Sequence, residues 1–288
     1  MKRIAGQRAA FLGAWLVLAA CERVVDLNIP EGPRLLVVEA RLERVLGAVS
    51  GNQTIKLSTT SSYFSGSVPP PAAGAVVRVT DPRGIATTFV ESAVRGTYTT
   101  NALPVVRGGI YTLNIDWEGN RYEATDTTRA VAPIDTFYFA DVKPGRFSGD
   151  KGVRATISFV DRPNEMNFYL WEQYVNGVRQ LGPDSSTKLR IIASDDGYDG
   201  LPINGLQPFE GIDIPRNADV LIRQVALSQD MYRYYFALSD IVGADGSPFS
   251  VPPSNLRGNI ANRTNPIVPA VGYFFVAEVA EARGKYVP

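Results

Sequence analysis

From residue 34 onward, apolar and polar residues alternate with a period of two, which is typical of half-buried β-strands. Residues 35–42 and 53–58 show this pattern, and residues 109–117 place four large side chains on one face of a strand. These four are Tyr111, Leu113, Ile115 and Trp117. The pattern predicts a mainly β protein.

Turn residues punctuate the predicted strands at short intervals. Asp81-Pro82-Arg83-Gly84 has the composition of a type I turn, and Glu118-Gly119-Asn120 closes a predicted hairpin. This spacing indicates a β-sandwich over residues 34–130. After a boundary near residues 130–133, alternation resumes and Asn176-Gly177 marks another hairpin, so we expect a second β-rich domain over residues 131–288.

One segment has helical rather than strand periodicity. Ser228 is suited to be an N-cap, and Asp230 lies in the first turn, where the helix dipole favours an acidic residue. Met231, Tyr235 and Leu238 recur at helical spacing before Gly243. The sequence predicts one short helix near residues 229–242.

The N-terminus has the pattern of an export signal over residues 1–20. Three basic residues precede an apolar stretch that is too short for a permanent membrane span. Leu18-Ala19-Ala20-Cys21 resembles a lipobox, which predicts cleavage between Ala20 and Cys21 and a diacylglyceryl and an N-acyl lipid on Cys21. The alternative is an ordinary buried cysteine, but the chain's single cysteine occupies the one position that lipidation requires. Residues 21–33 then form a lipidated tether.

Composition restricts the possible chemistry. Loss of the signal removes three of 29 basic side chains and leaves 26 against 29 acidic ones, so nucleic acid is not an expected partner. The chain has no histidine, which excludes histidine-based catalytic triads and removes the commonest zinc ligand. With Cys21 lipidated, a metal site would have to use oxygen ligands, and we expect no cofactor.

The order of motifs resembles a lipoprotein family of Bacteroidota known as domain of unknown function 4249. The likeness covers nearly the whole mature chain and lies in Cys21, Val25-Asp26-Leu27, residues 35–40, Tyr63-Phe64, residues 74–84, Gly109-Ile110-Tyr111-Thr112-Leu113, Tyr122-Glu123-Ala124, Phe159-Val160-Asp161, Asn167-Phe168-Tyr169, residues 232–235, Pro253-Ser254-Asn255, Gly258-Asn259-Ile260 and Gly272-Tyr273-Phe274. The resemblance implies an outer-membrane lipoprotein, often encoded beside a TonB-dependent receptor, with a transthyretin-like or immunoglobulin-like first domain. It brings no catalytic residues.

The densest group of carboxylates is the turn at residues 195–200. Asp195, Asp196 and Asp199 could hold calcium, but an EF-hand loop starting at Asp195 would have Gly197 and Leu206 at two ligand positions. We favour an acidic surface turn.

Carboxylate and aromatic side chains suggest two further functional hypotheses. Glycoside hydrolysis needs only two carboxylates, for which Glu165, Glu172, Asp195 and Asp196 are candidates, although solvated charges are the favoured interpretation. Four aromatic residues could offer apolar faces to a ligand or partner, but their helical spacing indicates core packing instead. They are Tyr232, Tyr234, Tyr235 and Phe236.

A loop rich in serine, glycine and proline carries the remaining aromatic pair. For Tyr63 and Phe64 on this loop, the sequence supports two interpretations equally: burial in the fold, or contact with a ligand or partner. Either side chain could offer a flat apolar face to a sugar, a peptide or a protein.

Together these observations predict a non-catalytic outer-membrane lipoprotein that acts by binding, as an accessory to a TonB-dependent nutrient transporter. A structural or adhesive surface module and a carboxylate-based glycan hydrolase are the alternatives. The sequence leaves open which ligand is bound and which side of the outer membrane the protein faces.

Overall fold

The computed structural model describes residues 32–48, 52–62, 68–142, 152–180, 191–209, 212–242 and 256–288. Residues Arg34–Pro288 form one compact unit. The predicted mainly β class is confirmed, and the helix α2 (Gln229–Val242) has the predicted bounds.

The strands in chain order are β1 (Leu36–Val45), β2 (Gln53–Thr59), β3 (Val76–Thr80), β4 (Ala86–Glu91), β5 (Thr97–Thr100), β6 (Ile110–Trp117), β7 (Asn120–Thr127), β8 (Thr136–Asp141), β9 (Val153–Val160), β10 (Phe168–Val175), β11 (Val178–Gln180), β12 (Ile192–Ser194), β13 (Pro202–Leu206), β14 (Asp219–Ala226), β15 (Ala261–Asn262) and β16 (Val271–Lys285).

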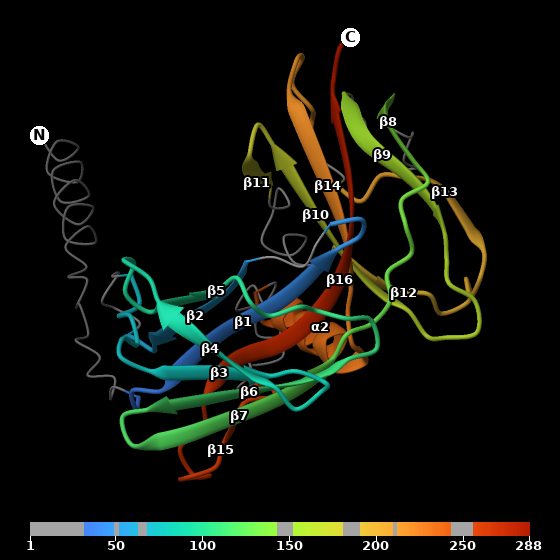
Figure 1. The fold of residues 1–288 in the computed structure, drawn as a ribbon. Helices are drawn as coiled ribbons and strands as arrows, with labels where there is room; N and C mark the ends of the chain where they lie inside the picture. The colour runs from blue at the N-terminus through green and yellow to red at the C-terminus, as the bar shows by residue number, and fades with distance from the viewer. Residues whose placement is uncertain are drawn as a thin grey trace, which may run out of the picture. The chain divides into compact units, whose positions relative to one another are not determined.

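Most strands belong to one long sheet (Figure 1). Its order is β11-β10-β14-β16-β1-β2-β5-β4-β3-β6-β7-β15, and β12 adds to β10. The β1–β16 pair is parallel, whereas β16 pairs with β14 in antiparallel fashion. A separate three-stranded sheet has the order β13-β9-β8.

The first hydrophobic core lies between the two faces of a sandwich. The inward side chains of β1 pack in one cluster with Tyr111, Leu113, Ile115 and Trp117 of β6, all of which are buried as predicted. The same cluster contains Phe274 and Val276 of β16. The sandwich predicted over residues 34–130 is therefore completed by a strand from the other end of the chain.

The second core packs the three-stranded sheet against β10 and β14. Ala155, Ile157 and Phe159 of β9 meet Trp171 of β10 and Ile222 of β14. The apolar clusters thus change near the predicted boundary at residues 130–133, but β16 pairs with strands on both sides of it. Residues 34–130 and 131–288 are continuous through this strand.

Side chains close the sandwich where β7 approaches β16. The Asn259 amide accepts a hydrogen bond from Phe274 N (3.0 Å) and donates to Phe274 O (2.8 Å), so it takes the place of a neighbouring strand. The Asp126 carboxylate accepts from Val276 N (2.9 Å). Burial raises the pKa of Asp126 above its ordinary value, against hydrogen bonds from Val276 and Thr127 that lower it.

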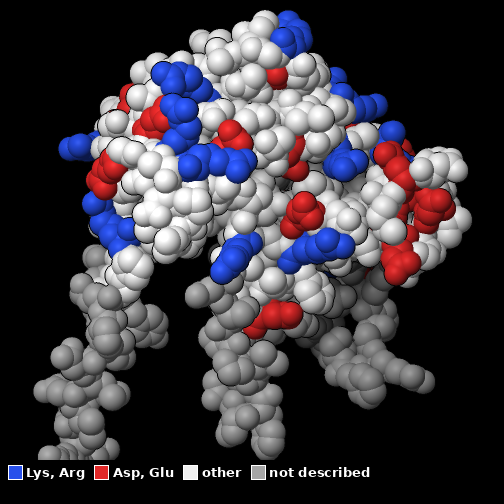
Figure 2. All heavy atoms as spheres, turned by 90° about the horizontal axis from the view of Figure 1, so that it is seen from below, with Lys and Arg blue, Asp and Glu red and all other residues white. Residues whose placement is uncertain are grey.

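The helix α2 begins where the sequence places it. The Ser228 hydroxyl accepts from Met231 N (3.3 Å), which is the geometry of an N-cap. Met231 is buried in a third cluster with Phe168, Leu170 and Val225, so α2 covers one face of β10 and β14. Figure 2 shows the unit from below, where basic and acidic side chains intermingle over much of the visible surface.

Among the helices of the described residues, none has the length and hydrophobicity needed to cross a membrane.

The Asn259 contacts give a test of the sandwich closure. We expect Asn259→Ala to lower the free energy of unfolding by roughly 2–3 kcal/mol, because the N–H and C=O of Phe274 lose their side-chain partner. Urea unfolding of the purified chain measures the change. Asn101→Ala, at an exposed position, is the matched control, and an equal effect of the two substitutions would contradict the role assigned to Asn259.

Candidate functional site

Several residues singled out in the sequence fall outside the described part of the structure. These are Ala20 and Cys21 of the predicted lipid anchor, and Tyr63 and Phe64 of the loop rich in serine and proline.

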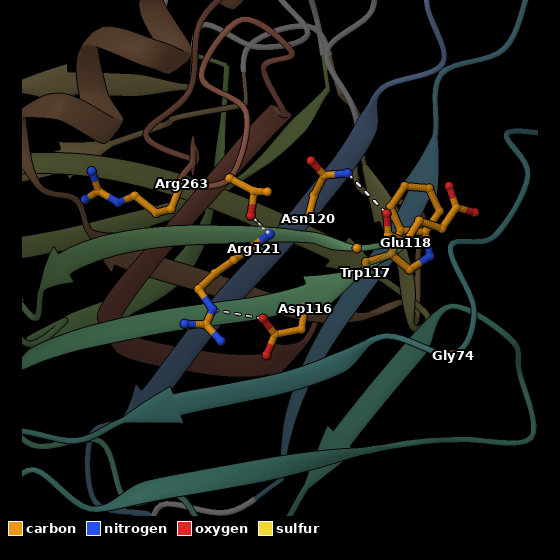
Figure 3. Close-up of a pocket in the computed structure, with 9 residues that line it drawn as sticks. Gly74, Asp116, Trp117, Glu118, Asn120, Arg121 and Arg263 are labelled. Atoms are coloured by element: carbon orange, nitrogen blue, oxygen red, sulfur yellow. Dashed lines mark hydrogen bonds and ion pairs between the residues drawn. The ribbon is translucent and has the colours of Figure 1, made fainter.

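A cavity of about 490 Å³ lies at the hairpin between β6 and β7 (Figure 3). Its lining consists of residues 116–121 of the hairpin together with Gly74, Arg263 and Thr264. Both residues of the two-residue turn have positive φ, 45° at Glu118 and 75° at Gly119. This is the conformation of a type I′ turn, which matches the right-handed twist of the two strands.

Ion pairs dominate the wall of this hairpin pocket. Asp116 accepts from Arg121 (3.0 Å), and Glu118 pairs with Arg34 (3.1 Å). The Arg34 guanidinium also lies over the ring of Trp117, 5.0 Å from its centre. The charged groups are half-exposed, so each pair stabilises the fold by less than about 1 kcal/mol. The pocket offers donors and acceptors for a polar ligand.

A buried ionic network lies on one face of the long sheet. The Glu172 carboxylate contacts three guanidinium groups, those of Arg41 (2.8 Å), Arg223 (2.9 Å) and Arg179 (3.0 Å). Arg223 also pairs with Glu281 (3.0 Å) and with Glu43. The network thus joins β1, β10, β14 and β16 on that face.

The arginines set the protonation state of Glu172. Burial alone would raise the pKa of this carboxyl, but attraction to Arg41, Arg179 and Arg223 outweighs burial and holds the pKa below the ordinary value. A general acid in glycoside hydrolysis needs the opposite shift, towards a raised pKa. The environment of Glu172 therefore disfavours the acid role that a hydrolase would require.

The other carboxylates considered for hydrolysis have separate partners. Glu165 pairs with Arg162 at an exposed position (2.5 Å), and Asp195 accepts from the backbone N–H of Asn167 (2.8 Å). Asp196 is exposed on the turn that follows β12. Three of the four candidates therefore have a fixed structural partner.

The acidic turn meets a second loop. Asp161, Asp195 and Asp199 each offer a carboxylate oxygen within 4.8 Å of the others, and Asp196 is not part of this group. Asp161 and Asp195 are buried, whereas Asp199 is exposed. We call residues 160–167 and 195–201 the two-loop cap.

Protein donors already engage these three carboxylates. Asp161 accepts from the Tyr169 hydroxyl (2.5 Å) and from Gly200 N (3.0 Å), and Asp199 accepts from Asn164 N (2.8 Å). Burial raises the pKa of Tyr169, and the hydrogen bond to Asp161 raises it further, so the hydroxyl stays protonated and donates. The carboxylates therefore join the two loops to each other and to β10.

The aromatic residues of α2 divide into two groups. Tyr232 packs on Phe168 (ring centres 4.8 Å apart) and Tyr234 on Tyr273 (4.9 Å), and Tyr235 packs against the same cluster. Core packing is thus confirmed for these three. Phe236, in contrast, is 54% exposed.

Sequence reasoning missed the role of Asp161 and of the arginines. Among the sequence motifs, Asp161 stands only in Phe159-Val160-Asp161, although an aspartate before Arg162-Pro163-Asn164 also indicates a side chain that accepts hydrogen bonds from loop N–H groups. Arg41 and Arg223 occupy polar positions of strands, which the alternation assigns to solvent. Only the pairing of β1, β16, β14 and β10 shows that the two arginines meet at Glu172.

A family model described as "Domain of unknown function (DUF4249)" matches residues 22–283, which shows that the chain belongs to this family. The resemblance seen in the sequence motifs is therefore confirmed. A search of curated proteins found no match to the chain.

The buried Glu172 predicts a dependence of stability on pH. Because the folded-state pKa is lowered, the charged carboxylate stabilises the fold above its unfolded-state pKa, and this stabilisation is lost as pH falls through the folded-state pKa. We expect Glu172→Gln to lower the free energy of unfolding by about 3–5 kcal/mol at pH 7. The difference from the wild type should shrink in acid, below the ordinary glutamate pKa of 4.5. Urea unfolding at a series of pH values measures it, and a difference independent of pH would contradict the assignment.

The two-loop cap gives a second test. Asp161→Ala removes the acceptor of both Tyr169 and Gly200, so we expect the free energy of unfolding to fall by roughly 2–4 kcal/mol. Asp196→Ala, at an exposed neighbouring position, should change it by less than about 0.5 kcal/mol.

The same variants distinguish a structural role from a cation site. If the three carboxylates serve as loop caps, the loss caused by Asp161→Ala is equal in calcium and in chelator. A calcium-dependent rise of Tm that the wild type shows and Asp161→Ala lacks would instead identify a calcium site.

Proposed function

We propose that this protein is a non-catalytic lipoprotein of the outer membrane, anchored through lipid on Cys21, that acts by binding as an accessory to a TonB-dependent nutrient transporter. The observation that carries the proposal is Cys21, the chain's single cysteine, at the end of a lipobox-like Leu18-Ala19-Ala20 sequence. Family membership over residues 22–283 adds support, because the matched region begins directly after this cysteine.

The tether restricts where the folded unit works. Residues 22–33 separate Cys21 from Arg34, and an extended chain of this length reaches at most about 45 Å. Arg34, the first residue of the folded unit, contacts Glu118 and Trp117 of the hairpin. Two or more acyl chains hold a protein stably at a bilayer, which keeps the folded unit near membrane proteins.

The chemistry of the described carboxylates also favours binding over catalysis. Glu172 is held ionised by three arginines, and Glu278 is fully buried between Arg44 and Arg107. Both groups stabilise the sheet, and the lowered pKa of Glu172 does not suit a proton donor at neutral pH. The hairpin pocket and the exposed loops remain as surfaces for recognition.

Isolation of the lipoprotein with its neighbours tests the proposal. We expect a tagged wild-type chain, recovered from gently solubilised outer membranes, to bring with it a large β-barrel receptor. Its mature N-terminus should be an acylated Cys21 by mass spectrometry. Cys21→Ala should be neither acylated nor retained in the membrane fraction, because both lipid groups attach at that residue.

A control variant and a topology assay accompany this experiment. Ser62→Ala, near the predicted contact loop, should leave acylation and membrane retention unchanged. Protease treatment of intact cells shows whether the folded unit faces the medium or the periplasm. A wild-type protein that is acylated but recovers no β-barrel would contradict the accessory role, and a mature chain without lipid would contradict the anchor.

A further inference from the structure

The two-loop cap carries four exposed large apolar side chains. Val160, Met166, Tyr198 and Leu201 all lie in it, and each is between 50% and 60% exposed. Single exposed apolar residues are ordinary on a protein surface, whereas several on two adjoining loops mark an interaction surface. These four exposed residues make the two-loop cap a candidate surface for contact with a partner.

Buried polar contacts hold these residues in place. The Asn167 side chain donates to the carbonyls of Arg162 (3.0 Å) and Glu165 (2.8 Å), while its backbone N–H donates to Asp195. Asp161 joins the other loop through Gly200 N. Loops fixed in this way lose little conformational entropy on binding, which favours affinity.

The cap is also strongly acidic. It contains five acidic residues, Asp161, Glu165, Asp195, Asp196 and Asp199, and one basic residue, Arg162, which pairs with Glu165. Asp161 and Asp195 are buried, so Glu165, Asp196 and Asp199 are the exposed carboxylates of the cap. Its net charge of −4 exceeds that of the whole mature chain, which is −3, so the rest of the mature chain is slightly basic. Figure 2 shows acidic side chains gathered at the right, the side on which Figure 1 shows the loops that follow β9 and β12.

We propose that the two-loop cap docks on a protein partner that presents an apolar depression ringed by lysine and arginine. This inference rests on the proposed function, because it names the surface through which the lipoprotein contacts its partner. Protein interfaces combine apolar contacts with polar and charged ones, and opposite charge speeds association. An anionic lipid surface would repel the cap, so charge favours a protein over the bilayer.

Photo-crosslinking in cells tests the inference with the full lipidated chain. A photoreactive amino acid replaces Tyr198 in the cap, and in a control it replaces Val94, which is 69% exposed in the turn after β4. We expect a protein adduct at position 198, and the crosslinked peptide of the partner should contain apolar residues together with lysine or arginine. The control should give no such adduct.

Substitutions in the cap complete the test. Met166→Ser combined with Leu201→Ser should lower the adduct yield about tenfold, because the exposed apolar centre is lost. Glu165→Gln with Asp196→Asn should lower the yield and weaken its dependence on salt. Val90→Ser at an exposed position of β4 should leave the yield unchanged.

The outcomes separate this inference from the proposed function. An adduct with a TonB-dependent barrel supports both the docking inference and the proposed function. An adduct with a different protein, at an apolar surface rich in lysine and arginine, supports the docking inference but contradicts the transporter role. The inference is overturned if the barrel is recovered but position 198 forms no adduct. It is also overturned if the substitutions in the cap leave the adduct yield unchanged. An adduct with lipid or with a second copy of this chain also overturns it.

Discussion

The pairing of β16 with two neighbours is the constraint on which the rest of the fold depends. Its first half runs parallel to β1, and its second half runs antiparallel to β14. Gly272 makes the start of the parallel pair possible, because it has φ +92° and a Cβ there would lie 2.0 Å from Val38 O. Since parallel strands need a long connection, nearly the whole folded unit lies between the two paired strands. The last segment of the chain is therefore needed to complete the first sandwich.

The charges on β16 show how the pairing is secured. Glu278 points towards Arg44 and Arg107, while Glu281 on the opposite face meets Arg223. Glu278 also accepts from Val131 N (3.1 Å), where the chain passes from the first core to the second. A buried carboxylate costs several kcal/mol to desolvate, and partners of this quality are needed to offset the cost. These pairs make one register of β16 strongly preferred.

Local features of the fold could be predicted from the sequence, and long-range features could not. The alternation of β6 and the cap of α2 at Ser228 depend on neighbouring residues, so their pattern is readable along the chain. The site at Glu172 depends on strands that are distant in sequence. The alternation pattern assigns Arg41 to solvent because the pattern reflects only the polarity of each residue and not its partners. Asp161 and Asp195 come together for the same reason, through loops more than 30 residues apart.

Acidic residues serve two opposite purposes in this protein, and the difference indicates where recognition occurs. On the strands, Glu172 and Glu278 are surrounded by arginines, so their charge is neutralised inside the fold. In the two-loop cap, the exposed carboxylates of Glu165, Asp196 and Asp199 outnumber the single Arg162, so part of their charge lies on the surface. The strand carboxylates have several arginine partners, whereas the cap contains only Arg162. The excess is thus a property of the loops, where exposed charge can contribute to recognition.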